Sequence, residues 1–169
     1  NWYIKSCKKI NYMFPKAHAA AYVMMAYRIA YFKVHHPQAF YNTYFTIKSD
    51  DFDAQIVLKG EEFIKQKINE INNKGNDATA KDKNTVRVLK IVIEALARGI
   101  SFCPVDIYES KTQEFQITEN GLRPPLISLD GLGNRAAENL VEARSEGEFT
   151  SIEDLSNKAS LSKTVIEVM

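Results

Sequence analysis

The chain has 169 residues, 45% of them hydrophobic, which is enough apolar material for one domain or for a core with a small satellite. Its formal net charge of only +1 argues against a general polyanion binder. It contains no uncharged apolar run of about 18 residues and no signal-peptide pattern, which excludes an ordinary membrane-spanning segment. Cys7 and Cys103 are too few for a metal cluster or a disulfide framework, and they suit a reducing cytoplasm.

The charges are unevenly distributed along the chain. Residues 1–49 contain seven Lys or Arg and no Asp or Glu, so the remaining residues carry a net charge of −6. This asymmetry predicts that the N-terminal part faces a polyanion. The chain opens at Asn1 rather than at Met and stops at Met169 within an apolar-periodic run, and we therefore expect it to be a piece of a longer protein.

Residues 12–37 form the most apolar helical pattern in the sequence. Ala, Val, Met, Ile and Phe cover nearly the whole circumference of the helix, which predicts burial on all sides, with the rest of the chain built around it. Pro15 is expected in the first turn, where a missing N–H costs nothing. Pro37 is expected to end the helix, because the residue before a proline avoids the helical region.

The start of this helix carries cations where the macrodipole favours anions. Lys16 and His18 stand beside backbone N–H groups that point outward, and this combination predicts an anion site, with phosphate as the ligand. Tyr22 lies four residues after His18 and shares its face. The alternative interpretation is a solvated lysine and a histidine packed in the core.

The segment FPKAHAAAY, followed by A-x-R-x-A-Y-F-K-x-H-H-P, resembles the fingers region of C-family bacterial replicative DNA polymerases, and most of all the PolC-type DNA polymerase III alpha subunit of Gram-positive bacteria. The resemblance implies that Lys16 and His18 contact the phosphates of an incoming deoxynucleoside triphosphate (dNTP). It places Tyr22 and Arg28 close by, although these two could equally serve fingers packing.

The same resemblance implies what this chain does not carry. In the family, a palm domain N-terminal to this region supplies the aspartates that hold two metal ions, so Mg²⁺ is expected as the cofactor of the full-length enzyme. No catalytic or metal-binding residue is expected here. The sliding clamp and the replisome are expected to bind regions outside this chain.

Three acids invite a metal-site interpretation, but capping explains them better. Asp50 reads as a helix N-cap supported by Asp53 three residues later. Asp51 lies between them, and nothing nearby supplies the strand-borne placement that two-metal phosphoryl transfer needs.

The rest of the first region is predicted from periodicity and turn residues. A helix after Pro37 is expected to pack Phe40, Tyr44 and Ile47 inward, although Tyr44 and Tyr41 could also stack on bases. The other expected elements are a helix from Asp50 along the Ile56–Ile71 stripe, an exposed loop over 73–84, and a helix over Thr85–Arg98 ended by Gly99. A short β-hairpin is expected within 103–123, with Glu109–Lys111 as its connector and Glu119, Asn120 and Gly121 as turn residues.

Pro124-Pro125 marks the predicted boundary between a fingers region, 1–123, and a tandem helix-hairpin-helix region, 124–169, in a mostly α-helical fold. Gly131 and Gly133 are expected to adopt positive φ and to admit a DNA phosphate, with Leu132 as the core plug. Asn134 opens the following helix, whose N–H groups face the phosphate. Arg135 and Lys163 are expected to assist. The alternative is a purely structural helical hairpin.

A second, glycine-poor copy follows. Thr150 and Glu153 form a predicted capping box, and Ala159–Ser162 stands where the glycines would be. The expected partners are primer–template duplex and dNTP, with no membrane. The alternative function is a non-enzymatic helix-hairpin-helix scaffold of DNA repair or recombination. Such a scaffold would have no need of a cationic, acid-free N-terminal half.

Overall fold

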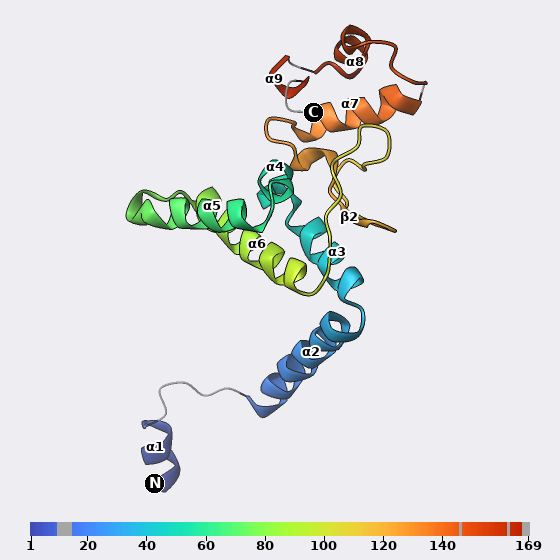
Figure 1. Ribbon diagram of the computed structural model, residues 1–169. Helices are drawn as coiled ribbons and strands as arrows, with labels where there is room; N and C mark the ends of the chain where they lie inside the picture. Colours follow the sequence, from blue (N-terminus) through green and yellow to red (C-terminus); the bar gives the residue numbers. More distant parts are fainter. Residues whose placement is uncertain (10–14, 146, 162, 167–169) are drawn as a thin grey trace. The chain divides into compact units, whose positions relative to one another are not determined.

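A computed structural model describes residues 1–9, 15–145, 147–161 and 163–166 (Figure 1). The fold is mostly α-helical with one small two-stranded sheet, which confirms the predicted class. The chain divides into two compact units, Asn1–Pro37 and Gln38–Met169, and each is described by itself. The predicted division at 123/124 therefore stays a prediction. Within the described ranges, none of the helices combines the length and the apolar character that crossing a bilayer requires.

The elements follow one another with short connections. The α-helices are α1 (Trp2–Cys7), α2 (Lys16–His35), α3 (Pro37–Ile47), α4 (Ala54–Leu58), α5 (Glu61–Asn73), α6 (Ala80–Ala97), α7 (Asn134–Ser145), α8 (Ile152–Ala159) and α9 (Lys163–Ile166). The short 3₁₀ turns are η1 (Ser49–Asp51), η2 (Gly75–Asp77) and η3 (Leu126–Ser128), and the strands are β1 (Gln116–Thr118) and β2 (Gly121–Arg123).

Helix α2 contradicts the prediction of a buried central helix. None of its residues is buried, and Val23 and Phe32 keep 67% and 53% of their surface exposed. The core of the chain forms from α3 onward. The apolar residues on all sides of α2 thus remain at least partly exposed, because the described residues 1–9 and 15–37 do not bury them. Pro15 is the N-cap rather than a first-turn residue.

The core of the second unit is built on four phenylalanine rings from separate segments. Phe45 of α3 lies 5.4 Å from Phe52 and 5.4 Å from Phe102, measured between ring centroids, and Phe115 lies 4.9 Å from Phe52. The Phe115 N–H also donates to the Thr46 hydroxyl at 3.0 Å. These contacts join α3 to the chain that follows α6 and fix the centre of the fold.

The buried face of α3 is shifted by one position along the helix from the predicted face. Tyr41 and Phe45 are fully buried, Tyr44 is partly buried, and Ile47 is 75% exposed. Burial, followed by the neighbouring Glu94 carboxylate, raises the pKa of Tyr41 to about 12, so its hydroxyl stays neutral at physiological pH. Tyr41 is thus a core residue and is not available for base stacking.

The acidic segment caps a helix, as expected, but through a different residue. Asp53 is the N-cap of α4 and accepts from the Ile56 N–H at 3.1 Å, whereas Asp50 lies in η1. The predicted long helix is also interrupted. Gly60 has φ of +93°, a conformation that ends α4 and starts α5 in a new direction.

Helix α6 starts five residues before the predicted position. Thr79 and Asp82 form a capping box: the Asp82 N–H donates to the Thr79 hydroxyl at 3.1 Å, and the Thr79 N–H donates to the Asp82 carboxylate at 3.0 Å. This box brings residues 80–84 of the predicted loop into the helix. Gly99, with φ of +79°, follows the C-cap, as predicted.

The sheet turns at Glu119–Asn120, within the predicted turn residues 119–121, whereas the predicted connector at 109–111 lies before both strands and is wrong. Thr118 pairs with Gly121 in the antiparallel register, and the Leu122 N–H donates to the Ser101 carbonyl at 2.8 Å. A Cβ at Gly121 would lie 2.3 Å from that carbonyl oxygen. Glycine is therefore needed here for close backbone approach.

A second apolar cluster lies under α7, α8 and α9. Leu140 and Ala159 are fully buried there, and Arg144 of α7 ties the cluster to the preceding loop by donating to the carbonyls of Ile107 and Ser110 at 2.9 and 2.8 Å. Burial lowers the pKa of Arg144 from its usual value, but a guanidinium remains charged at any ordinary pH. The Arg144 side chain thereby anchors the connection to the hairpin region.

Candidate phosphate-binding sites

The first candidate site is the N-terminus of α2. Pro15 caps the helix without a side-chain hydrogen bond, and the first turn contains no acid. The Ala19 N–H donates to the Pro15 carbonyl at 3.0 Å, which is the first bond of the helix. The N–H groups of the turn before it therefore lack an intrahelical acceptor and point along the helix axis toward any bound anion.

The side chains predicted to bind the anion at this end are partly brought together. The His18 and Tyr22 rings lie 4.3 Å apart in an edge-on arrangement, so these two residues share one face, and Lys16 is exposed at the tip. Arg28 stands at another level, since twelve residues separate it from Lys16, about 18 Å along the axis. Lys16, His18 and the first-turn amides can contact one phosphate group, whereas Arg28 can reach only a distant part of a ligand.

The second candidate site is the hairpin between η3 and α7. Leu132 is 4% exposed and fills the second apolar cluster, as the predicted plug should. Gly131 has φ of +83°, which a residue with a Cβ adopts only under strain. Gly133, Asn134 and Arg135 are exposed, so nothing in the described chain covers the start of α7.

Gly133 does not have the positive φ that the pattern predicted. Its carbonyl accepts from the Ala137 N–H at 3.0 Å, which gives it the role of the residue that starts α7, and such residues have ordinary extended backbone. A Cβ at Gly133 would meet no atom within 4 Å. A side chain at Gly133 would therefore not collide with the described chain, but it would obstruct a ligand bound at this point.

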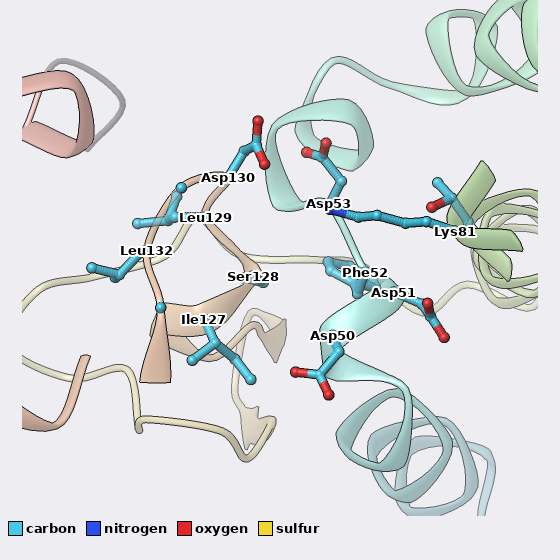
Figure 2. Close-up of a pocket in the computed structure, with 13 residues that line it drawn as sticks. Asp50, Asp51, Phe52, Asp53, Lys81, Ile127, Ser128, Leu129, Asp130 and Leu132 are labelled. Atoms are coloured by element: carbon cyan, nitrogen blue, oxygen red, sulfur yellow. The ribbon is translucent and has the colours of Figure 1, made fainter. Parts of the chain in front are cut away.

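An acidic hollow of about 420 Å³ lies between this hairpin and the segment around η1 (Figure 2). Asp50, Asp53 and Asp130 project around it, and Lys81 is the one cation among the described lining residues. Carboxylates repel a phosphate at this range. Gly131 and Gly133 also line the hollow, so its carboxylates would oppose a phosphate that approached the hairpin from within it. In the described ranges, no three His, Cys, Asp or Glu side chains are placed to hold a metal ion.

The second hairpin copies the first more closely than its sequence suggested. Ser160 adopts φ of 53° and ψ of 42°, the left-handed conformation that Gly131 occupies in the first copy, and Leu161 is buried like Leu132. The side chain of Lys163 lies outside the described residues, although its backbone opens α9.

The helix before this second hairpin is capped one residue later than expected. Ser151 accepts from the Asp154 N–H at 3.1 Å, and the Asp154 carboxylate accepts from the Thr150 N–H at 3.0 Å. The predicted pairing of Thr150 with Glu153 is thus wrong by one position. This Thr150 hydrogen bond, with help from Lys158, lowers the pKa of Asp154.

Comparison with known proteins adds two findings. The family described as helix-hairpin-helix motif matches residues 99–169. The whole chain is 56% identical to DNA polymerase III PolC-type of Caldanaerobacter subterraneus, 54% identical to that of Bacillus subtilis and 53% identical to that of Clostridium perfringens. In each case the alignment covers 100% of this chain and 12% of the relative's length.

Proposed function

Since this chain matches one region of the PolC-type DNA polymerase III family from its first residue to its last, we propose that it is the fingers and helix-hairpin-helix region of a DNA-directed DNA polymerase. The full-chain identity of 53–56% carries this proposal. The full-length enzyme copies a primed DNA template in the cytoplasm. Its Mg²⁺ ions are held by carboxylates outside this chain, and its clamp and replisome contacts are made elsewhere.

In this proposal α2 binds the incoming nucleotide. Lys16 and His18 contact the triphosphate beside the uncapped amides of the first turn, and the positive charge of Lys16 offsets the repulsion between phosphates. Tyr22 supports His18 through the edge-on ring contact. Arg28 reaches a remote part of the nucleotide or the polymerase. These groups bind and orient the triphosphate, while the metal ions supply the chemistry of phosphoryl transfer.

The hairpin region binds the primer–template duplex. Backbone amides at Gly133, Asn134 and Arg135 meet a phosphate from outside the acidic hollow, and the Arg135 side chain adds charge, with Lys163 assisting from the second copy. Amides that meet only phosphates carry no base information. Binding should therefore be indifferent to sequence, as copying of any template requires.

A chimeric polymerase tests the proposal. The matching region of the Bacillus subtilis enzyme, which is 54% identical, is replaced by this chain, and primer extension with Mg²⁺ and all four dNTPs is measured. We expect extension at a rate within about tenfold of the parent enzyme, because the inserted chain is 54% identical to the segment that it replaces. The unmodified parent is the control.

Two outcomes would contradict the proposal. One is a chimera that is folded, binds primed DNA and still fails to extend it. The other is robust extension by the 169-residue chain alone, because the proposal assigns the metal-binding carboxylates to a different part of the enzyme. A non-enzymatic scaffold would give the first outcome and a complete polymerase the second.

A further inference from the structure

Three cations of α6 form a stripe that neither candidate site uses. Lys83, Arg87 and Lys90 follow one another at spacings of four and three, which places them on one face of the helix, and all three are exposed. The face that carries Val86, Leu89 and Val92 is buried. The stripe is thus part of the exposed side of α6, and the helix itself packs next to α5 (Figure 1).

The stripe lines a hollow of about 280 Å³ between α6 and the end of α5. Asn72 of α5, with Gly75 and Ala78 of the connection, forms the opposite wall, and the described lining residues include no Asp or Glu. This distinguishes it from the acidic hollow beside the hairpin, which Asp50, Asp51, Asp53 and Asp130 line.

The three cations also differ from their neighbours in how they are paired. Lys65 and Lys67 of α5 form ion pairs with Glu61 and Glu70 at 2.8 and 2.9 Å, and Lys74 pairs with Asp82 at 3.2 Å. In the part of the chain that the structure describes, no ion pair involves the stripe, and Arg87 donates only to the neutral Asn84 amide oxygen at 3.1 Å. Like charges at these helical spacings repel one another, so an anion across the stripe would stabilise it.

The dimensions and chemistry of the stripe indicate the kind of anion. Lys83 and Lys90 are seven residues apart, about 10 Å along the axis, which is long enough for two or three consecutive phosphates. The lining offers no aromatic ring on which a base could stack and no carboxylate to read a base edge. A flexible strand can follow a hollow on one helix face, whereas a duplex is a stiff, convex rod.

We propose that Lys83, Arg87 and Lys90 bind the sugar–phosphate backbone of single-stranded DNA without reading its sequence. The inference rests on the proposed function for its choice of polymer, because a polymerase must hold an unpaired template strand. It assigns that strand to residues of α6 that belong to neither the α2 terminus nor the hairpin.

The test compares two triple variants of the 169-residue chain that remove the same formal charge. The first is Lys83→Gln, Arg87→Gln, Lys90→Gln; the matched control is Lys65→Gln, Lys67→Gln, Lys74→Gln, which removes three paired cations of the same region. Fluorescence anisotropy measures binding of labelled oligothymidylate and a mixed-sequence single strand across a salt series. A duplex of the same length is the third probe.

The stripe variant should lose about ten- to a hundredfold in single-strand affinity, equally for both sequences, and its log–log salt slope should fall by about 2, since each neutralised phosphate contributes about 0.7. The control should keep the wild-type slope. Equal losses in both variants, no single-strand binding by the wild-type chain, or an equal loss of duplex affinity would each overturn the inference. Primer extension by the chimera tests the proposed function separately, so an active chimera with an unchanged stripe variant would reject the inference alone.

Discussion

Helix α2 carries apolar side chains around most of its circumference, yet none of its residues is buried, whereas α3 places Tyr41 and Phe45 at zero exposure. The difference does not lie in helix propensity, since both segments are helical. It lies in the partners: Phe52, Phe102 and Phe115 surround Phe45, whereas none of the described segments 1–9 and 15–37 buries a residue of α2. An apolar helix surface thus predicts that the helix has a packing partner, but it does not identify the segment that packs against it.

The largest expected effect contrasts two phenylalanines of these helices. Phe45→Ala should lower the free energy of unfolding of this chain by about 3–5 kcal/mol, because it leaves a cavity at the centre of the aromatic cluster. Phe32→Ala, at 53% exposure, should change it by less than about 0.5 kcal/mol. Urea unfolding measures both, and a loss of 2 kcal/mol or more for Phe32→Ala would show that α2 is buried in solution.

This contrast also shows which features of the fold could be predicted from the sequence alone. Periodicity predicted the helices, the class and the Leu132 plug, because these follow from local spacing. It misplaced the buried face of α3, since two of the rings around Phe45, those of Phe102 and Phe115, lie more than fifty positions further along the chain. It also placed the start of α6 too late, although the Thr79–Asp82 signature was readable in the sequence.

For the candidate sites, too, the sequence predicted the local features but not those that depend on distant segments. The Lys16–His18 terminus and the exposed Gly133 loop follow from local motifs. The acidic hollow beside the hairpin was not predicted, because Asp50 and Asp130 meet only in the folded chain. The separation of Arg28 from Lys16 follows from helix geometry and needed only the confirmed length of α2.

A smaller effect contrasts two glycines. Gly121→Ala should destabilise the chain by about 1–3 kcal/mol, because the added Cβ would collide with the Ser101 carbonyl and φ of +133° disfavours a side chain. Gly133→Ala should leave the free energy of unfolding within about 0.5 kcal/mol of wild type, since its Cβ meets no atom. Thermal unfolding of the two variants side by side is the measurement. Equal destabilisation would mean that Gly133 serves folding rather than a ligand.

The smallest effect concerns the caps of the second unit. Thr79→Ala should cost about 1 kcal/mol, because it removes the hydroxyl of the capping box of α6. The Thr79 N–H and hydroxyl hold the pKa of Asp82 below its ordinary value, so the carboxylate stabilises the fold above an unfolded pKa near 4 and loses this effect as the pH falls through the lowered folded pKa.

Urea unfolding of wild type and Asp82→Asn at several pH values checks this sign. The difference in unfolding free energy between the two proteins should be constant from pH 7 to about 5 and should shrink as the pH falls toward 3. A difference that grows in acid, or that does not depend on pH, would contradict the assigned role of the Asp82 carboxylate. Glu62→Gln, an exposed change on α5, is the control.

The central claim is that α2 serves the nucleotide while the hairpin serves the duplex, and one crossed measurement in the chimeric polymerase tests it most directly. Lys16→Ala and Gly133→Val are compared for kcat/KM with dNTP and for Kd with primer–template. Lys16→Ala should lower kcat/KM about ten- to a hundredfold and leave the duplex Kd unchanged. Gly133→Val should weaken duplex binding at least about tenfold and, at saturating DNA, leave dNTP use unchanged, since its methyl groups block only the phosphate approach. Variants that change both quantities together, or neither, would contradict the account.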